Sequence, residues 1–431
     1  MSDATPDVAE PESTRISRRG WLFLGALGLS IAGTAWGFLD ATSIAVIDGG
    51  TDEGSVYAGL FVSLGLVFTA ITVPLVPRAC RLLGETGAFS LSRWGMVVST
   101  IAVGLVILAG FADERVLLVY APFYGAFVGL ALVLNPLFAS RMMGKAGMAR
   151  AYARLSVVGG LAWAIGALVG GWITDHTSSG WGLLAMGIAA IPLALLTMTS
   201  AEPGETAVDA GDEAEKATEA KPKSGPRASL AALRANPTLL KITIFAAAIA
   251  FFASPLVSLI VPIADELYHR TFITSASIMM AGLSVGEMLT PVIVGGLKKR
   301  FNDLHGAAVA SLACGLLLIV FTLDALFFQG NVELAFWVVL SLAFGGARYA
   351  SRALALGAAS TSRPGESEVS TMSIYFLAVM VTAPIGVAWW SLVIEYVNVV
   401  TALLVGAAGT IAISLWLLRQ PQVSRPPRVI Q

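Results

Sequence analysis

Charged residues are scarce in this sequence. Asp, Glu, Lys and Arg make up 13% of the 431 residues, against about 25% in soluble domains. Hydrophobic residues make up 56%, and the mean hydropathy is +0.78. A soluble fold is therefore excluded. The formal net charge of -1 also leaves no basic field of the kind that nucleic-acid binding requires, so we expect no nucleic-acid partner.

Cysteine and histidine are nearly absent, with two and three copies. Cys80 and Cys314 lie far apart in the sequence, so we expect packed thiols and no disulfide framework. No spacing typical of a metal site occurs. The sequence also lacks the G-x-x-x-x-G-K-S/T phosphate loop and the H-E-x-x-H zinc motif. We therefore expect no metal, no cofactor and no enzymatic activity.

What the sequence does contain is long apolar runs, each near the 20 or so residues that cross a bilayer. They predict an all-α polytopic membrane protein with twelve spans. The predicted spans are residues 21–43, 57–77, 89–111, 116–140, 153–174, 181–199, 238–263, 272–296, 305–328, 333–357, 370–394 and 398–418.

The basic residues predict the orientation of these spans, because Lys and Arg near span ends stay on the cytoplasmic side. With the N-terminus inside, all of the 27 Lys and Arg residues except Arg115 and Arg270 fall on the cytoplasmic side. The first apolar run has no cleavage pattern, so we interpret it as a span. We expect a multi-pass protein of the bacterial cytoplasmic membrane with both termini in the cytoplasm.

The chain divides into two sets of six spans. Residues 201–227 between them are polar and contain no aromatic residue, a composition that cannot bury a core. Residues 228–234 have helical spacing and form either a surface helix or plain linker. The predicted parts are a cytoplasmic tail 1–20, a six-helix bundle 21–200, a linker with surface helix 201–237, a second six-helix bundle 238–419, and a tail 420–431.

The two sets also resemble each other as a repeat. A shift of 217 residues places Gly65-Leu66 and Pro74 on Gly282-Leu283 and Pro291. The same shift pairs Trp172 with Trp389. Such matches are few, so the repeat depends mainly on the equal arrangement of six spans and six spans.

Six spans, a cytoplasmic linker and six more spans resemble the major facilitator superfamily over nearly the whole chain. Leu39-Asp40-Ala41-Thr42 is similar to the L-D-x-T motif of drug exporters in this superfamily. Residues 166–171 (GALVGG) are similar to its antiporter motif, with alanine in place of proline. Residues 363–366 (RPGE) resemble the siderophore and macrolide exporter branch. The resemblance implies two six-helix bundles related by a pseudo-two-fold axis.

Residues 77–85 occupy the position of the family's cytoplasmic loop motif between the second and third spans. Gly84 fits that motif, whereas Arg81 stands in place of the aspartate and Glu85 in place of the arginine. A pair of reversed charges at this spacing can still form a latch. We expect Arg81 and Glu85 to act at a cytoplasmic gate, or to match the motif in position only.

Ionisable side chains at membrane depth are the best candidates for chemistry, because each costs about 2.5 to 3.5 kcal/mol at a helix centre. Glu287 lies about 15 residues into its span, roughly 22 Å from the end, and we expect it to carry protons. The alternative is a structural carboxylate paired with an arginine. Arg348 lies at similar depth in another span and either pairs with Glu287 or binds an anionic substrate group. Arg352, one turn further, can reach the interface.

Asp40 is a second candidate for proton coupling, with an interfacial carboxylate as the alternative. Asp324 and Glu395 are expected to be solvated at outer span ends. Aromatic residues in the spans that line the central cavity of this superfamily favour a bulky, amphipathic substrate. They are Trp36, Phe68, Tyr124, Trp163, Phe252 and Tyr375.

These observations predict a monomeric secondary transporter, embedded in the lipid bilayer, that exports an amphipathic small molecule against proton entry. One six-helix half would rock against the other. A proton-coupled uptake symporter is the first alternative. A polytopic membrane enzyme is a remote one, because the outer loops are too short to gather catalytic groups.

Overall fold

The computed structural model describes residues 18–47, 54–142, 148–199, 233, 236–268, 272–327, 331–362 and 368–420. These residues are almost entirely helical. A membrane requires this, because no water is available inside the bilayer to pair with backbone N–H and C=O groups. The predicted linker 201–227 lies outside the described residues, and of the surface helix 228–234 only Leu233 is described. The predicted all-α fold is confirmed.

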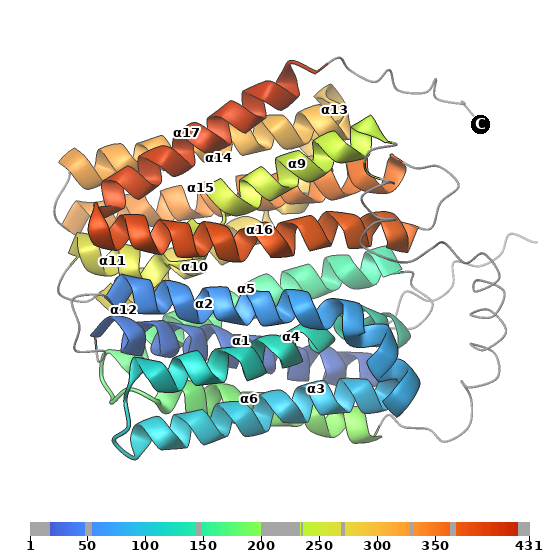
Figure 1. The fold of residues 1–431 in the computed structure, drawn as a ribbon, viewed down its shortest axis with the longest axis vertical. Coiled ribbons are helices and arrows are strands. Elements are labelled where there is room, and N and C mark those ends of the chain that lie inside the picture. The colour runs from blue at the N-terminus through green and yellow to red at the C-terminus, as the bar shows by residue number, and fades with distance from the viewer. Residues whose placement is uncertain are drawn as a thin grey trace, which may run out of the picture.

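The helices form two halves, drawn one above the other in Figure 1. The N-terminal half contains α1 (Arg18–Ile47), α2 (Gly54–Thr72), η1 (Val73–Leu75), α3 (Val76–Leu108), α4 (Glu114–Met142), α5 (Met148–Thr174) and α6 (Trp181–Thr199). The C-terminal half contains α9 (Pro237–Phe252), α10 (Pro255–Ser258), α11 (Ile260–Tyr268), α12 (Phe272–Met288), α13 (Thr290–Arg300), α14 (Asp303–Phe327), α15 (Asn331–Thr361), α16 (Glu368–Tyr396) and α17 (Val399–Leu418).

Within the described residues, ten helices are long and apolar enough to cross a membrane, and an eleventh is added if the bent pair of α12 and α13 is one span. The helix α15, which carries Arg348 and Arg352, completes the set of twelve by its length and by its packing between α12 and α14. Successive spans alternate in direction. We call the two ends of the bundle the Arg18 end, where α1 begins, and the Ile47 end, where α1 finishes.

Two predicted spans are broken in the structure. The seventh span is divided into α9, α10 and α11 around Pro255. The eighth bends by 48° between Met288 and Thr290, one residue before Pro291. Proline has no N–H to donate, and its ring clashes with the carbonyl four residues earlier. That carbonyl belongs to Glu287, so the bend lies directly beside this carboxylate.

Glycines let the helices within each half approach closely, as expected where lipid gives little drive for association. A Cβ on Gly125 of α4 would lie 2.1 Å from the Gly65 carbonyl oxygen of α2. A Cβ on Gly286 of α12 would lie 2.1 Å from the Leu342 carbonyl oxygen of α15. The pair α2 and α4 corresponds to the pair α12 and α15 in the repeat. The pseudo-two-fold arrangement is therefore visible in backbone packing as well as in helix order.

The two halves meet along two seams. One seam joins α5 to α12, where a Cβ on Gly160 would lie 3.1 Å from the Ser284 carbonyl oxygen. The other joins α2 to α16, which lie side by side in Figure 1. There the Ser63 hydroxyl donates to the Pro384 carbonyl at 3.0 Å.

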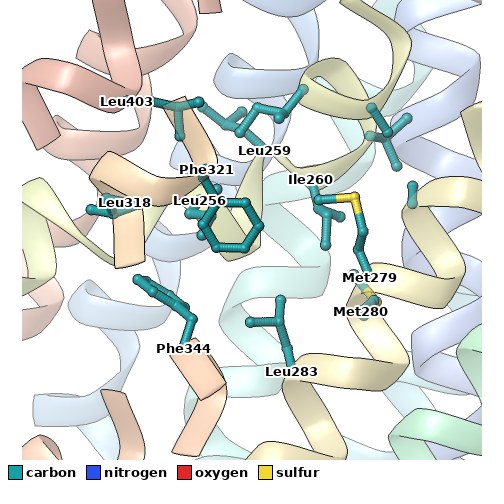
Figure 2. Packing of buried hydrophobic residues seen from close by; sticks show 14 of the residues in the cluster. Leu256, Leu259, Ile260, Met279, Met280, Leu283, Leu318, Phe321, Phe344 and Leu403 are labelled. Carbon is teal, nitrogen blue, oxygen red and sulfur yellow. The ribbon is translucent and has the colours of Figure 1, made fainter. Parts of the chain in front are cut away.

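A buried apolar cluster fills the C-terminal half between these seams and the Ile47 end. Figure 2 shows its centre, where side chains from α10, α11, α12, α14, α15 and α17 pack together. Met280 and Leu283 of α12 contribute to it, as does Phe344 of α15. These residues lie within two turns of Glu287 on one helix and Arg348 on the other. The charged groups therefore lie next to a packed, water-excluding core.

The segment 77–85 is not a loop, contrary to our expectation. It belongs to α3, which is continuous from Val76 except at Gly84, where φ is 71° and ψ is 163°. Glycine has no Cβ and tolerates this left-handed φ. The break means that helical i,i+4 spacing does not hold between Arg81 and Glu85. Arg81 is exposed and Glu85 is half-buried, and their role in a gate stays a prediction.

Candidate functional site

Glu287 is part of a polar group between α12 and α15. The Tyr349 hydroxyl donates a hydrogen bond to its carboxylate, and the guanidinium groups of Arg348 and Arg352 are close enough to act on it electrostatically. Of these three residues, Arg348 was predicted as a partner of Glu287. Arg352 was expected to reach the interface, and Tyr349 was not among the residues predicted from the sequence.

The two arginines of this group differ in their surroundings. Arg348 is half-buried, and its guanidinium carbon lies 5.2 Å from the centre of the Tyr349 ring. Arg352 is exposed, and its guanidinium lies 5.9 Å from the Phe376 ring of α16. Within the described part of the chain, no ion pair of 4.0 Å or less joins either arginine to Glu287.

The N-terminal half contains a buried arginine that the sequence analysis did not single out. Arg93 of α3 is 4% exposed, donates to the Asn135 amide oxygen of α4, and lies 5.1 Å from the Phe89 ring. Asn135, in the middle of an uncharged apolar run, was the signal that could have revealed a polar contact there.

Tyr124 links this arginine to the first span. Its hydroxyl forms a hydrogen bond with Thr34 of α1, and the Arg93 charge acts on it electrostatically. Its ring lies 5.5 Å from the ring of Tyr120, whose hydroxyl is 2.7 Å from the Thr100 hydroxyl. Tyr124 is therefore a predicted aromatic that lies under the influence of a buried charge.

Asp40 is completely buried in the N-terminal half. Its carboxylate accepts hydrogen bonds from the backbone N–H groups of Gly180, at 3.0 Å, and Leu183, at 3.1 Å. These groups belong to the start of α6, and the first N–H groups of a helix have no partner within the helix. The geometry favours a structural role for Asp40 in joining α1 to α6, while proton coupling through it stays a prediction.

The remaining predicted aromatics are distributed over both halves. The Trp36 indole donates to the Thr174 hydroxyl of α5 at 2.9 Å, and Trp163 of the same helix lies 6.5 Å from the Phe38 ring. Phe68 is 36% exposed on α2. Tyr375 is 2% exposed within the C-terminal half. The structure brings Trp36 and Trp163 to the interface of α1 and α5 and leaves Phe68 and Tyr375 apart from them.

A cavity of about 790 Å³ opens along the seam between α2 and α16. It extends from Ser63 towards the Arg18 end of α2, and its walls are almost entirely apolar. They include Val67, Ala70 and Ile71 of α2 and Leu377, Val381 and Ile385 of α16. No ionisable residue lines it. The cavity lies at the seam between the halves, whereas the charged groups lie at α12 and α15.

The carboxylates at the Ile47 end are not simply solvated, contrary to our expectation. Asp324 is 3% exposed. Glu395 accepts a hydrogen bond at 3.0 Å from the backbone N–H of Ser55 in the opposite half. Their positions at span ends suggested contact with water, but neighbouring helices cover them. Within the described residues no group of three or more His, Cys, Asp or Glu side chains could hold a metal ion.

Comparisons with solved structures give the same architecture. A D-xylose-proton symporter superposes with a TM-score of 0.70 at 13% identity, covering 93% of this chain and 97% of that one. The nucleoside transporter NupG superposes with a TM-score of 0.67 at 13% identity, covering 93% and 98%. A POT family transporter in complex with a thioalcohol-conjugated peptide gives 0.66 at 15% identity, covering 92% and 95%. At such identities the likeness shows the fold alone.

A search of curated protein sequences finds no significant match. The sequence profile of the Major Facilitator Superfamily, by contrast, matches residues 23–387. That range covers all but the last part of the second six-helix half, in agreement with the helix order and the paired seams. The chain belongs to the Major Facilitator Superfamily, and it is a membrane transporter and not an enzyme.

Proposed function

We propose that this protein is a proton-coupled secondary transporter in which Glu287 is the proton-carrying group. The observation that supports this proposal is the grouping of Glu287, Tyr349, Arg348 and Arg352 between α12 and α15. A carboxyl group held at membrane depth beside a bend in its own helix can change its charge as the halves rock. Tyr349 gives the ionised carboxylate a donor when water is excluded.

The charge balance of this group favours a substrate with an anionic part. When Glu287 is ionised it attracts the two arginines, and when it is protonated this attraction disappears. Arg348 is then free to bind a carboxylate or phosphate through its planar set of donors. Proton binding and anion binding would then favour each other, and by linkage the effect is equal in both directions. This coupling is the one that a symporter needs.

Proton-driven export of an amphipathic molecule is the second candidate. It is supported by the resemblance of residues 39–42 to the exporter motif and by the aromatic side chains of Trp36 and Trp163 near the interface of α1 and α5. Export by antiport requires substrate and proton to compete for the site. The two candidates therefore predict proton movements of opposite sign.

We would test both candidates with purified protein in liposomes that contain the pH dye pyranine. The solutes are 5-aminolevulinic acid, dialanine, uridine, D-xylose and ethidium, each added outside without an imposed gradient. Symport acidifies the interior when a solute enters, whereas antiport makes it more alkaline. Solute entry without any proton movement would contradict both candidates.

The variant Glu287→Gln separates coupling from binding. It retains size and hydrogen bonding but fixes the neutral state, so proton movement should be lost while exchange of labelled solute continues. The matched control is Glu266→Gln in α11, which removes an exposed carboxylate outside the group at Glu287. Full proton movement in Glu287→Gln would refute the assignment and make Asp40 the next carboxylate to test. Arg348→Ala should then weaken binding of 5-aminolevulinic acid and dialanine, which carry a carboxylate, and leave D-xylose unaffected.

A further inference from the structure

Several carboxylates at the Ile47 end bind the first turns of helices. Asp113 accepts a hydrogen bond at 2.8 Å from the N–H of Arg115 in α4, which begins next to it. Asp40 binds the start of α6 in the same half. Such capping is favourable, because the first four N–H groups of a helix have no partner within the helix. Both contacts stabilise one half and place no constraint on the other.

Two further carboxylates make the same contact across the boundary between the halves. Asp175, which follows the last residue of α5, accepts from the N–H of Thr274 in α12 at 3.1 Å and also from the Thr274 hydroxyl. Glu395, in the last turn of α16, accepts from the N–H of Ser55 in α2 at 3.0 Å. Each carboxylate therefore binds the first turn of a helix that belongs to the opposite half.

The two contacts are related by the internal repeat. Asp175 ends the fifth span and binds the eighth, whereas Glu395 ends the eleventh span and binds the second. The shift of 217 residues carries the fifth span onto the eleventh and the second onto the eighth. Under this shift Asp175 falls three residues before Glu395, which is about one helical turn. The same arrangement is thus built twice, once at each seam and in opposite directions.

The surrounding contacts show that the Ile47 end is closed in this structure. A Cβ on Gly59 of α2 would lie 2.2 Å from the Ser391 hydroxyl oxygen of α16. The Ser391 side chain is 1% exposed. Backbone and side chain therefore meet here without space for water. Rocking of the halves towards the opposite conformation must break this contact together with the two carboxylate bonds.

We propose that Asp175 and Glu395 form a paired latch that holds the Ile47 end closed by binding the first turns of α12 and α2. They are positioning residues for the transport cycle, because they act on the conformation and need not touch the substrate. The proposal rests on the closed contacts at this end and on rocking of the two halves. It does not require Glu287 to carry the proton, so the two proposals can fail independently.

The expected size of the effect follows from the loss of helix caps. Removing a side chain that caps a helix only in the closed form should raise the ratio of open to closed protein by about fivefold. The two contacts lie at different seams and share no partner, so their effects should multiply. We therefore expect the open fraction to rise about fivefold in each single alanine variant and about 25-fold in the double variant.

Ser391 offers a reporter for opening at this end. In a background of Cys80→Ser and Cys314→Ala, the substitution Ser391→Cys places one thiol at the closed contact. A membrane-impermeant maleimide added from the Ile47 side of reconstituted protein can reach it only when the seam opens. While the closed state predominates, the labelling rate is proportional to the open fraction.

The test variants are Asp175→Ala, Glu395→Ala and the double alanine variant. Asp175→Ala is compared with Asp175→Asn, and Glu395→Ala with Glu395→Gln. The amides retain an acceptor oxygen and should label close to the parent rate. The matched control is Asp113→Ala, which removes a cap of the same chemistry within one half. A thermal-unfolding curve for each variant separates opening from loss of fold.

We expect the three alanine variants of Asp175 and Glu395 to label faster than the parent, and the double variant fastest. The amide variants and Asp113→Ala should label close to the parent rate. Parent-like labelling in both single alanine variants would overturn the proposal. It would also be overturned if Asp113→Ala labelled as fast as Asp175→Ala, because the effect would then be general loosening. If the double variant does not fold, the two single variants and their amide rescues decide the question.

Discussion

Gly286→Ala tests whether the close approach of α12 and α15 is required for the site at Glu287. Gly286 directly precedes Glu287, and a Cβ at this position would lie 2.1 Å from the Leu342 carbonyl oxygen and 2.8 Å from the Gly346 nitrogen. Both atoms are backbone atoms, so no side chain can rotate away. Ordinary contact begins at 3.4 Å, and the two helices must therefore separate by 1.3 Å, the difference between 3.4 and 2.1 Å.

The cost can be estimated from two opposing effects. Overpacking costs about 1 to 3 kcal/mol, and the upper end applies because the obstacle is backbone. Alanine gains about 1 kcal/mol over glycine in a helix. The net loss in the free energy of unfolding is about 2 kcal/mol, which lowers the melting temperature of a unit the size of one six-helix half by about 4 to 8 °C. Separation of the helices also weakens the hydrogen bond from Tyr349 to Glu287, so proton-coupled transport should fall.

The measurement is thermal unfolding of the purified protein in detergent, together with proton movement in liposomes. Gly295→Ala, in α13 of the same bent span, is the matched control, because nothing lies within 4 Å of its added Cβ. It should be as stable as the parent or slightly more stable. Equal melting temperatures for Gly286→Ala and Gly295→Ala would refute the reasoning. Lower stability with unchanged transport would show that the site tolerates the separation.

Two further predictions concern carboxylates at the Ile47 end. Asp40→Ala leaves the N–H groups of Gly180 and Leu183 buried without their acceptor, at a cost of about 1 to 3 kcal/mol. Thermal unfolding should therefore show a loss of stability that Asp40→Asn partly restores. Equal stability of both variants with the parent would contradict the structural role. Burial raises the pKa of the Asp175 carboxyl above its ordinary value, although the Thr274 N–H and His176 act in the opposite direction. Because the pKa is higher in the closed form than in a solvated open form, protonation favours closure, and this contribution is lost as the pH rises through the raised pKa. In a Glu395→Gln background, the labelling rate of the thiol in Ser391→Cys should therefore fall as the pH falls towards that value. The rate is divided by that of the same protein carrying Asp175→Asn at each pH, because this ratio removes the titration of the thiol itself.

The helix content and the depth of Glu287 could be predicted from the sequence. The thickness of the bilayer sets the length of each apolar run, and backbone groups in lipid must pair within their own helix. Counting residues along a run then gives depth directly, which located Glu287 and Arg348. The bend before Pro291 was equally open to prediction, since proline acts through its own ring and the preceding turn.

Lateral contacts could not be predicted in the same way. Nothing in the sequence singled out Arg93, yet Asn135 of a neighbouring helix gives its buried guanidinium an acceptor. Asp40 finds its donors 140 residues later in the chain, at Gly180. In a soluble protein, an apolar stripe shows which face of a helix is buried. In a membrane, lipid is as apolar as the protein interior, so that contrast is lost.

The sequence by itself therefore determined which segments cross the bilayer, their order, and the depth of each charged residue along its helix. Only the tertiary structure decided which residues meet: Tyr349 with Glu287, Asp175 with the start of α12, and Glu395 with the start of α2. The physical reason is the distance along the chain between the residues that interact. Span formation depends on local hydrogen bonds and on the length of each apolar run, whereas these contacts depend on how the helices rotate and pack, which glycines and long-range neighbours decide.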